Sequence, residues 1–374
     1  MPVKCQVIMD CMDRLAPRYL AESWDNVGLL VGNPAQSIDK ILVSLDVTEA
    51  IVNKAVADGV NLIIAHHPLI FKPFANLRTD MPQGRMLAAI LKADMAIFAA
   101  HTNLDIASGG VNDILAQKLQ LQQVEPLSES YSERLVKLAV FVPKDHVEEV
   151  RQAITKAGAG FIGNYSECTF QSEGIGTFFP QEGSSPFIGQ QGKLTYTPEI
   201  KLETILPEKF SKRVIKAMLR SHPYEEVAFD LYPLNNTGKT FGLGRIGSLP
   251  DALSLREFAV VVRNVLGGNQ IRMVGLPDKP IRKVAVCGGS GAGLIKRAVF
   301  SGADVLITGD LKYHEAQEAI ELGIGVIDAG HFATEFPVVE MLADYLKGCS
   351  LANKWNVTIN ADDTSEDIFI PLIL

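Results

Sequence analysis

Four of the seven histidines follow short apolar runs, at points where the strands of a sheet would end. They are His66, His67, His101 and His331. In open α/β sheets, ligands gather beyond the carboxyl ends of the strands, so all four imidazoles lie where a binding site is expected. His66 and His67 are neighbours, and successive side chains of a strand point in opposite directions. The pair is therefore awkward for one metal ion and better suited to two ions, with one imidazole on each.

Carboxylates recur at a fixed spacing from two of these histidines. Glu335 follows His331 by four residues at the start of a predicted helix, so both side chains project from one helical face. The same spacing lets the two histidines of an H-E-x-x-H helix bind one ion. Asp105 stands four residues after His101 and offers a further oxygen. Imidazoles and carboxylates together suit zinc, manganese, iron or cobalt, and paired ions of this kind lie about 3.5–4 Å apart around a shared water or hydroxide.

Two further segments bring polar groups close to the same predicted strand ends. The segment SWDNVGLLVG contains Trp24 and Asp25 before an apolar strand. It is either a turn closed by its own Asx side chain or a loop that lines the cleft. The segment GDLKYHEA supplies Asp310 and His314, which are candidates for supporting the metal ligands or for transferring protons.

The glycine-rich segment CGGSGAG at residues 287–293 lies between a predicted strand and a predicted helix. Backbone amides at such a helix start can bind a phosphate. The segment lacks both the lysine of a P-loop and the G-x-G-x-x-G spacing. Tight packing of the strand against the helix is the alternative that we favour.

Short apolar runs alternate with helical segments in the first and last thirds of the chain. The first third has the runs KILVSLDV, NLIIAHH and MAIFAAHT, and the last third has RKVAVCGG, ADVLITGD and IGVIDAGH. This alternation is typical of an α/β fold with mainly parallel sheets that are covered on both faces.

The two thirds also resemble each other. Aligning Lys40 with Lys283 without a gap places Gly59 on Gly302. After an extra loop in the first copy, HTNLD falls on HFATE, and each has the form His-x-x-x-acid after an apolar strand. Any two βαβ units resemble each other to some degree, which is the alternative explanation. Duplication predicts two pseudo-repeated βαβ halves whose strand ends face one shared cleft.

The middle third follows another pattern. Its predicted elements have the order strand, helix, strand, strand, helix, strand, which is the ferredoxin-like arrangement. We therefore expect an inserted α+β domain at residues 130–235 that interrupts a discontinuous α/β core at residues 1–129 and 236–374.

Composition excludes several classes of protein. The chain has 374 residues, 47% of them hydrophobic and 21% charged, with a net charge of −8. This balance argues against a protein that mainly binds nucleic acid or an anionic membrane, and no apolar run approaches the ~20 residues of a membrane helix. The five cysteines are widely spaced, and no CxxC occurs. We expect reduced cysteines in a cytoplasmic protein and assign none of them to a metal.

Taken in order, SWDNVGLLVG, IIAHHPLIF, HTNLD, GDLKYHEA and DAGHFATE resemble the NIF family of dinuclear-metal proteins, whose bacterial members are commonly labelled GTP cyclohydrolase 1 type 2 homologues. The resemblance covers nearly the whole chain. It implies two divalent metal ions, with zinc expected first and manganese, iron or cobalt as alternatives. The implied ligands are His66, His67, Asp105, His331 and Glu335. Glu335 would contact both ions, and His101 would lie behind the ligands rather than among them.

The resemblance also implies a PII/CutA-like inserted domain, which SHPYEEVAFDLYPL would end, and a homohexamer whose metal sites face an internal cavity. The first functional hypothesis is a metal-dependent hydrolase with Glu335 as the catalytic residue, acting in the ring opening of GTP or on phosphoesters. The second is a metal-binding regulatory or sensor protein without turnover that binds a small-molecule effector. A nucleic-acid partner is a third hypothesis, which the acidic balance disfavours.

Overall fold

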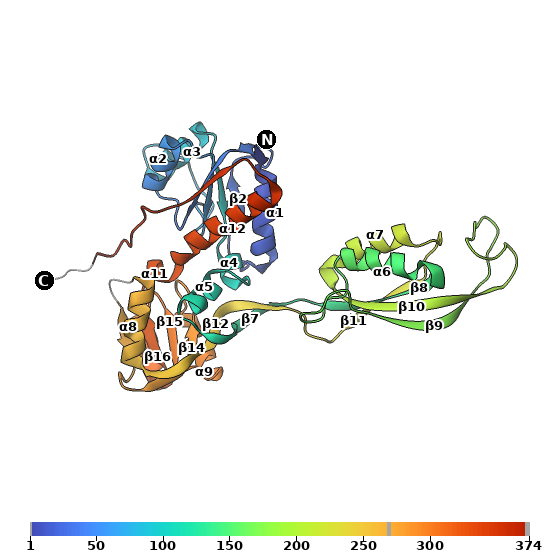
Figure 1. The fold of residues 1–374 in the computed structure, drawn as a ribbon. Coiled ribbons are helices and arrows are strands. Elements are labelled where there is room, and N and C mark those ends of the chain that lie inside the picture. Colours follow the sequence, from blue (N-terminus) through green and yellow to red (C-terminus); the bar gives the residue numbers. More distant parts are fainter. Residues whose placement is uncertain (1, 268–270, 371–374) are drawn as a thin grey trace. The chain divides into compact units, whose positions relative to one another are not determined.

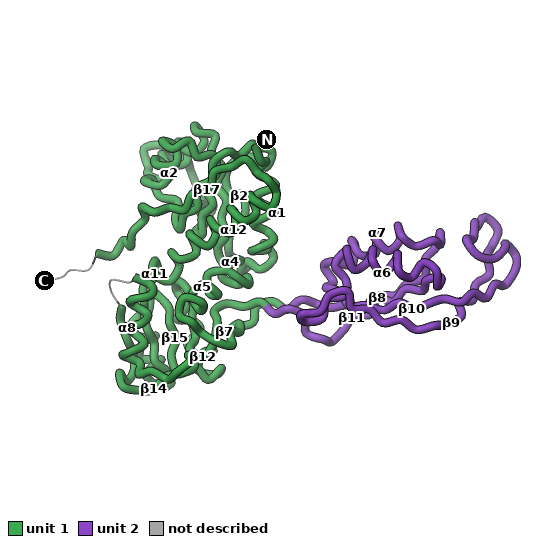
Figure 2. Tube along the Cα trace, viewed as in Figure 1, with its two compact units in different colours: residues 1–131, 241–374 green, residues 132–240 purple. Residues whose placement is uncertain are grey.

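The computed structural model describes residues 2–267 and 271–370 (Figure 1). The chain divides into two compact units (Figure 2). The core unit consists of Met1–Tyr131 with Phe241–Leu374, and the insert unit consists of Ser132–Thr240.

The first sheet of the core unit has five strands in the order β17-β4-β5-β6-β2. β17, β4, β5 and β6 run parallel, and β2 pairs with β6 in the antiparallel direction. The strands are β17 (Thr358–Ala361), β4 (Lys40–Ser44), β5 (Leu62–Ala65), β6 (Ala96–Ala99) and β2 (Gly28–Val31). A separate two-stranded sheet pairs β1 (Val3–Lys4) with β3 (Ser37–Ile38).

Both faces of the first sheet are buried, as a parallel sheet requires. Alternate residues of β4 show this, because Ile41 and Val43 belong to one apolar cluster and Leu42 belongs to another. One face packs against α1 (Cys5–Leu15) and α12 (Pro337–Asn353). The other face packs against α2 (Glu49–Ala57) and α3 (Pro82–Lys92).

The second sheet of the core unit has six strands in the order β13-β16-β15-β14-β12-β7. Their bounds are β13 (Arg272–Val274), β16 (Gly325–Asp328), β15 (Val305–Thr308), β14 (Pro280–Val286), β12 (Thr240–Ser254) and β7 (Gln122–Ser132). β14, β15 and β16 are parallel, whereas β13 and β12 pair in the antiparallel direction with β16 and β14. The prediction of mainly parallel sheets is therefore wrong for this half, where the flanking strands make the sheet mixed.

Helices also cover both faces of the second sheet. Apolar side chains of α5 (Val111–Lys118) and α8 (Leu255–Leu266) pack on one face. Those of α9 (Ile295–Phe300) and α10 (Tyr313–Glu321) pack on the other. Two short helices complete the unit, α4 (Thr102–Ile106) and α11 (His331–Glu335).

The two halves of the core unit exchange elements. α12 and β17 come late in the chain but pack on the first sheet, whereas α5 and β7 come early but pack on the second. This exchange explains why both sheets belong to one compact unit. Each sheet contains three parallel strands that neighbour one another in chain order, as the predicted duplication requires; the duplication itself stays a prediction.

The insert unit is a four-stranded antiparallel sheet with two helices, in the order strand, helix, strand, strand, helix, strand. Its elements are β8 (Leu135–Pro143), α6 (Val147–Lys156), β9 (Thr169–Phe178), β10 (Thr195–Pro207), α7 (Ser211–Ser221) and β11 (Phe229–Leu234). The strand order β11-β8-β10-β9 places β9 and β11 at the edges. This element order is the ferredoxin-like arrangement, and one apolar cluster between the helices and the sheet forms its core.

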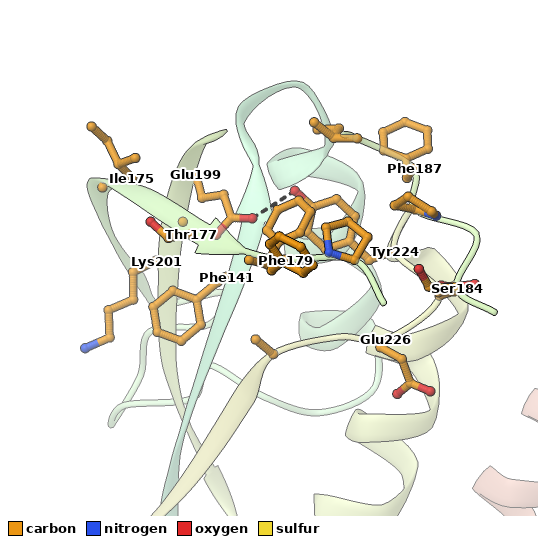
Figure 3. A pocket seen from close by; sticks show the side chains of 18 of the residues that line it. Phe141, Ile175, Thr177, Phe179, Ser184, Phe187, Glu199, Lys201, Tyr224 and Glu226 are labelled. Carbon is orange, nitrogen blue, oxygen red and sulfur yellow. Dashed lines mark hydrogen bonds between the residues drawn. The ribbon is translucent and has the colours of Figure 1, made fainter. Parts of the chain in front are cut away.

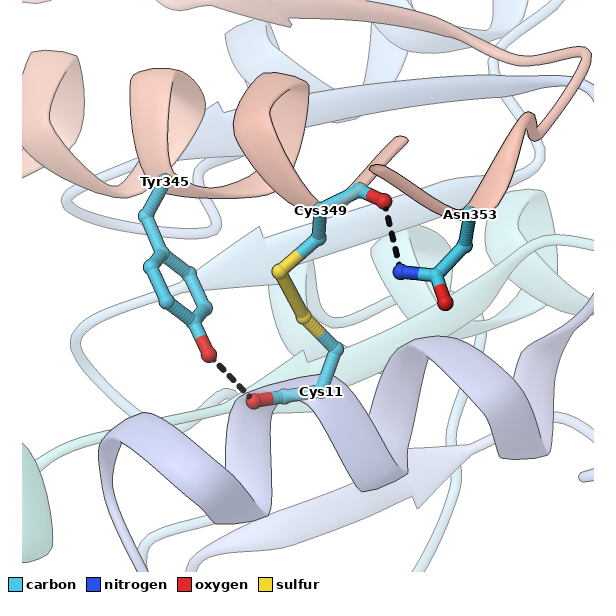
Figure 4. The surroundings of a disulfide bond; sticks show 4 residues. All are labelled: Cys11, Tyr345, Cys349 and Asn353. Carbon is cyan, nitrogen blue, oxygen red and sulfur yellow. Dashed lines mark hydrogen bonds between the residues drawn. A yellow bond between two sulfur atoms is a disulfide. The ribbon is translucent and has the colours of Figure 1, made fainter. Parts of the chain in front are cut away.

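A disulfide joins Cys11 of α1 to Cys349 of α12 (Figure 4). The hydroxyl of Tyr345 donates a hydrogen bond to the Cys11 carbonyl at 2.9 Å beside it. The expectation that all five cysteines are reduced is therefore wrong for this pair, whose members are 338 residues apart in sequence. They meet because α1 and α12 pack on the same face of the first sheet. Cys5, Cys168 and Cys287 are free.

Across the described residues, no helix combines the length and the apolar character needed to cross a membrane.

Candidate metal centre

The parallel strands bring the four histidines together at their carboxyl ends. β5 ends at Ala65, directly before His66 and His67. His101 follows β6, and His331 follows β16. His66 is fully buried, whereas the side chains of His67 and His331 are 24% and 36% exposed. The cluster is therefore closed at His66 and open to solvent at His331.

Two short helices carry the carboxylates. α11 begins with His331 and ends with Glu335, and α4 directly follows His101 and includes Asp105. One helical turn separates His331 from Glu335, so both lie on the same side of α11, whereas His101 precedes α4 with a non-helical backbone. Nε2 of His331 lies 3.0 Å from Oε2 of Glu335. The side chains of Glu335 and Asp105 are 5% and 13% exposed.

Glu335 lies between the histidines of both halves. Its Oε2 is 2.9 Å from Nε2 of His67, and its Oε1 is 3.8 Å from Nε2 of His66. Nε2 of His66 also lies 3.6 Å from Oδ1 of Asp105. Nε2 of His67 and Nε2 of His331 are 3.4 Å apart. The nitrogen and oxygen atoms thus converge on one small region with Glu335 at its centre.

The second ring nitrogen of every histidine in the cluster already has a hydrogen-bond acceptor. Nδ1 of His66 donates to the carbonyl of Ala100 at 2.8 Å. In the other three rings Nδ1 donates to a carboxylate, in the pairs His67–Asp46 at 2.8 Å, His101–Asp25 at 2.9 Å and His331–Asp310 at 2.7 Å. A donor at Nδ1 leaves the lone pair on Nε2, which is the arrangement that orients a histidine for metal binding.

Three buried atoms of the cluster have no hydrogen-bond partner among the described residues: Nε2 of His66, Oδ1 of Asp105 and Oε2 of Glu335. Buried polar atoms are almost always paired, because an unpaired one costs free energy. Oε2 of Glu335 lies within hydrogen-bond distance of two Nε2 atoms, but those nitrogens carry lone pairs when Nδ1 holds the proton. These atoms therefore fit a metal ion, which accepts lone pairs from all of them.

Without a metal ion, the carboxylates around the histidines favour the protonated, positively charged form of His67 and His331. Burial lowers the pKa of His67, but hydrogen bonds to Asp46 and Glu335 outweigh it and raise the pKa to about 10. Glu335 likewise raises the pKa of His331 to about 9. Burial raises the pKa of Asp105. A metal ion that binds here must displace protons, as metals do at imidazole sites.

His101 lies closer to the other histidines than its expected place behind the ligands implied. Two groups of side chains bring potential ligand atoms within 4.8 Å of one another. The first group contains His66, His67 and His101, and the second contains His67, His331 and Glu335. The ring of His101 is 5.2 Å from the ring of His66 and 5.6 Å from that of His67. His101 therefore faces the cluster itself.

The segment around Trp24 and Asp25 lies beside His101. Asp25 binds Nδ1 of His101 and the backbone nitrogen of Thr102, at 2.9 and 3.0 Å. Burial opposes its ionisation, but these hydrogen bonds lower the pKa of Asp25 to about 2. Asn26 donates its backbone N–H to the carboxylate of Asp25. This contact joins adjacent residues, whereas an Asx turn bonds the side chain to the backbone two residues on.

Trp24 forms an exposed aromatic rim with Phe71. The two side chains are 57% and 47% exposed, and their ring centroids lie 5.7 Å apart. Both rings also lie near the imidazole of His101, at 6.1 and 6.4 Å. We call Trp24 and Phe71 the aromatic rim below.

Asp310 and His314 have different surroundings. Asp310 reaches His331 from a backbone with φ of 57°, a left-handed conformation that is uncommon for a residue other than glycine. His314 lies exposed on α10, where its Nδ1 pairs with Gln317 at 3.0 Å. The described contacts do not bring His314 to the other histidines.

The glycine-rich segment after β14 makes room for Glu335. A Cβ on Gly289, whose φ is +60°, would lie 2.1 Å from Oε1 of Glu335. Its backbone N–H donates to Thr334 at 3.0 Å. The helix that follows, α9, has six residues. This segment therefore packs closely against Glu335. The favoured interpretation of its glycines, tight packing of the strand against the following helix, stays a prediction.

Asp46 is a site residue that the motifs did not single out. It comes two residues after β4, at the same edge of the sheet as His66 and His67. The signal that could have identified Asp46 was its position as a polar residue after β4, the strand next to β5 in the sheet. It was hidden inside KILVSLDV, whose apolar run predicts a strand over its whole length.

The chain has relatives across its full length. The sequence profile of the family Duf34/NIF3 (NGG1p interacting factor 3) matches residues 3–367. A Bacillus subtilis protein named GTP cyclohydrolase 1 type 2 homolog is 45% identical over 367 residues, which is 98% of each chain. A protein of the same name from Halalkalibacterium halodurans is 48% identical over 326 residues, or 87% of this chain and 88% of that one.

Solved structures agree with this placement. A Bacillus cereus protein related to NIF3 has a TM-score of 0.94 at 45% identity and covers 100% of both chains. A Staphylococcus aureus protein has a TM-score of 0.79 at 32% identity and covers 99% of both. The family match over nearly the whole chain confirms the resemblance seen in the motifs. The chain belongs to the Duf34/NIF3 (NGG1p interacting factor 3) family.

Proposed function

We propose that this chain is a hydrolase that depends on two divalent metal ions. One ion would be held by His66, Asp105 and Glu335, and the other by His67, His331 and Glu335. The observation that carries the proposal is a set of three buried atoms with lone pairs and no hydrogen-bond partner among the described residues. They are Nε2 of His66, Oδ1 of Asp105 and Oε2 of Glu335. Zinc is the metal we propose first, with manganese, iron or cobalt as alternatives, because these donors discriminate weakly among first-row ions.

Bound divalent ions lower the pKa of water toward neutrality and stabilise negative charge that develops on a substrate. The chain's own residues supply the rest. Glu335 reaches both ligand sets, so its loss should disable both. His101, whose Nδ1 is held by Asp25, offers a ring nitrogen to the group that it forms with His66 and His67.

The aromatic rim supports a substrate with a flat ring. Trp24 and Phe71 are exposed beside His101, and exposed aromatic side chains stack on nucleobases. Opening the imidazole ring of GTP fits these features, because one water attacks the carbon between two ring nitrogens and opens the ring to a formamide, and a second water hydrolyses the formamide and releases that carbon as formate. The names of the relatives from Bacillus subtilis and Halalkalibacterium halodurans agree with this choice.

Formate release from GTP tests the proposal. The protein is stripped of metal and reloaded separately with zinc, manganese, iron(II) and cobalt, and bound metal is counted for each preparation. Glu335→Gln is measured beside the unchanged protein. Glu340→Gln is the matched control, because Glu340 is an exposed carboxylate on the neighbouring helix α12. We expect metal-dependent formate that the Glu340 variant retains and the Glu335 variant loses.

Absence of formate with all four metals, in protein that holds two ions per chain, would refute the GTP reaction. A phosphodiester such as bis(4-nitrophenyl) phosphate, run with the same preparations, then tests the phosphoesterase alternative. If both substrates are left intact, the second candidate stands, which is a metal-binding sensor without turnover. That candidate is supported by the cavity of the insert unit, described below.

The remaining parts of the proposal concern organisation. We propose that the insert unit is a PII/CutA-like domain, supported by its βαββαβ order, that the chain assembles as a homohexamer, and that it works in the cytoplasm. Exposed apolar side chains on β9 and β10, including Phe170 and Tyr196 at 66% each, support a contact surface between copies. Light scattering on the purified protein tests the assembly, and a mass other than six chains would refute it.

A further inference from the structure

The insert unit contains a cavity of about 710 Å³ that is separate from the metal centre. Its walls come from β8, β9, β10, the connection at residues 179–194 and the segment before β11 (Figure 3). The lining side chains that matter here are Phe141, Ile175, Phe179, Phe187, Glu199 and Tyr224. The volume lies within the range of about 300–1,000 Å³ that small-molecule sites occupy.

Aromatic rings form much of the lining. Phe187 and Tyr224 have ring centroids 6.3 Å apart, and Phe178 lies 6.1 Å from Tyr224. Phe179 and Phe187 remain 47% and 56% exposed. Rings in this number, with faces left open, bind flat apolar groups and also attract cations through their negative faces.

Glu199 supplies a buried negative charge among these rings. The residue is 8% exposed, and its Oε1 accepts a hydrogen bond from the hydroxyl of Tyr224 at 2.8 Å (Figure 3). Burial, and then the Glu199 carboxylate, raise the pKa of Tyr224, so its hydroxyl keeps the proton that it donates. The Oε2 atom of Glu199 lies over Gly176, where a Cβ on the glycine would come within 2.2 Å of it. A carboxylate can accept about four hydrogen bonds, and the described residues supply one.

The charges around the cavity favour a cation over an anion. Glu173, Glu225 and Glu226 join Glu199 in the lining, against Lys201 as the one cationic side chain among the described lining residues. Figure 3 shows the ammonium of Lys201 pointing away from Glu199 and the rings. Lys201 pairs with Glu203 at 3.3 Å instead. A phosphate-bearing ligand would meet the buried carboxylate without a cation to balance it, which costs free energy.

We propose that this cavity binds a small organic cation. The ammonium group would lie between Glu199 and the faces of Phe187 and Tyr224, and the apolar part of the ligand would lie along Phe141 and Ile175. The ring faces and the carboxylate act together here, as in the aromatic cages that recognise quaternary ammonium groups. The site is independent of the metal centre and of its proposed reaction.

Ligand-observed NMR on the full-length, metal-loaded protein tests the proposal with defined probes. Benzyltrimethylammonium is the cationic probe. Choline and 3,3-dimethylbutan-1-ol form a matched pair that differs in the charge of the head group, and ATP is the anionic probe. We expect both cations to bind, the neutral alcohol to bind about tenfold more weakly than choline, and ATP to leave bound benzyltrimethylammonium in place.

Three variants locate the binding. Glu199→Gln removes the charge and keeps the shape, and should weaken benzyltrimethylammonium binding by about tenfold. Phe187→Ala removes an exposed ring from the lining, so it should weaken binding without disturbing the fold. Phe170→Ala is the control, because Phe170 is 66% exposed on β9, a strand that contributes to the cavity walls, but is not itself part of the lining.

Several results would overturn the proposal. Equal binding of choline and its neutral counterpart would remove the role of charge. Displacement of the cation by ATP would identify an anion site instead. Failure of benzyltrimethylammonium to bind, or equal loss of binding in the Phe187 and Phe170 variants, would exclude this cavity as the cation site.

Discussion

The carboxylate of Asp46 accepts a hydrogen bond from Nδ1 of His67 at 2.8 Å, and Nε2 of the same ring lies 2.9 Å from Glu335. One imidazole therefore joins a carboxylate outside the cluster to the carboxylate at its centre. Asp310 does the same for His331, whose Nε2 lies 3.0 Å from Glu335. Asp25 accepts a hydrogen bond from Nδ1 of His101 in the same way. Carboxylates in this position fix the ring and make it a stronger ligand.

Asp46→Ala should lower the affinity for metal by about 10- to 100-fold, because such partners of metal-binding histidines contribute about that much. Competition with a chromophoric chelator measures the affinity. Asp39→Ala is the control, since Asp39 is exposed and precedes the same strand, β4. If both variants bind metal as tightly as the unchanged protein, Asp46 does not support the site.

Gly289→Ala should remove metal from the site through strain and collision together. The new Cβ would meet Oε1 of Glu335 at 2.1 Å on a backbone with φ of +60°. Left-handed backbone alone costs about 1–2 kcal/mol for a residue with a Cβ. Gly59→Ala separates the two effects, because Gly59 has φ of +67° with nothing within 4 Å of its Cβ.

Both glycine variants should therefore lose stability in urea unfolding, but metal analysis should find loss of bound metal in Gly289→Ala alone. Equal metal content in the two variants would mean that the carboxylate of Glu335 moves aside without cost.

Trp24→Ala should weaken the binding of GTP by at least about fivefold, because stacking on an aromatic side chain contributes about 1–3 kcal/mol per base. Trp24→Phe should recover part of the loss. Equilibrium dialysis with GTP measures the affinity of the unchanged protein and of both variants. The chain has two tryptophans, so quenching of Trp24 fluorescence in a Trp355→Phe background shows separately whether GTP reaches Trp24. GTP that binds without quenching Trp24 and with unchanged affinity in Trp24→Ala would exclude the aromatic rim from substrate binding.

Asp362→Asn should cost about 1 kcal/mol near neutral pH and less in acid. Asp362 is 3% exposed, and its carboxylate accepts hydrogen bonds from the backbone and hydroxyl of Thr364 at 3.0 and 2.7 Å. Burial opposes ionisation, but these bonds and one from Ser365 lower the pKa of Asp362. A lowered pKa gives stability that is present above the unfolded-state pKa of about 3.9 and is lost as the pH falls through the folded-state pKa.

Urea unfolding at pH 7 and at pH 3 measures the loss of unfolding free energy caused by Asp362→Asn at each pH. Asp363→Asn is the control, because the neighbouring side chain is 84% exposed although it pairs with Lys54, and it should change stability little at either pH. A difference between Asp362→Asn and the unchanged protein that is as large at pH 3 as at pH 7 would contradict the role of the charge.

Much of the fold follows from the sequence, because burial leaves a pattern along each segment. The alternation of apolar runs and helices predicted β4, β5 and β6 and later β14, β15 and β16, and all six are present. The order of elements in the insert unit was predicted in the same way, and the structure confirms it. What the pattern could not give is the direction of the flanking strands β12 and β13, which depends on how the chain returns to the sheet rather than on which residues are buried.

The candidate site divides in the same way. Its ligand candidates stand at strand ends and at helical spacing, so residue type and position are enough to mark His66, His67, His331 and Glu335. Asp46, the inward position of His101 and the pairing of Cys11 with Cys349 depend on contacts between segments far apart in the chain. His314 has the type and the location that the pattern asks for, yet the turn of α10 leaves it exposed. Side-chain type and local periodicity were enough to identify the candidate ligands, because both can be read along a single segment. Which of these side chains meet depends on how the sheets and helices pack, because the contacts join segments that are far apart in the chain.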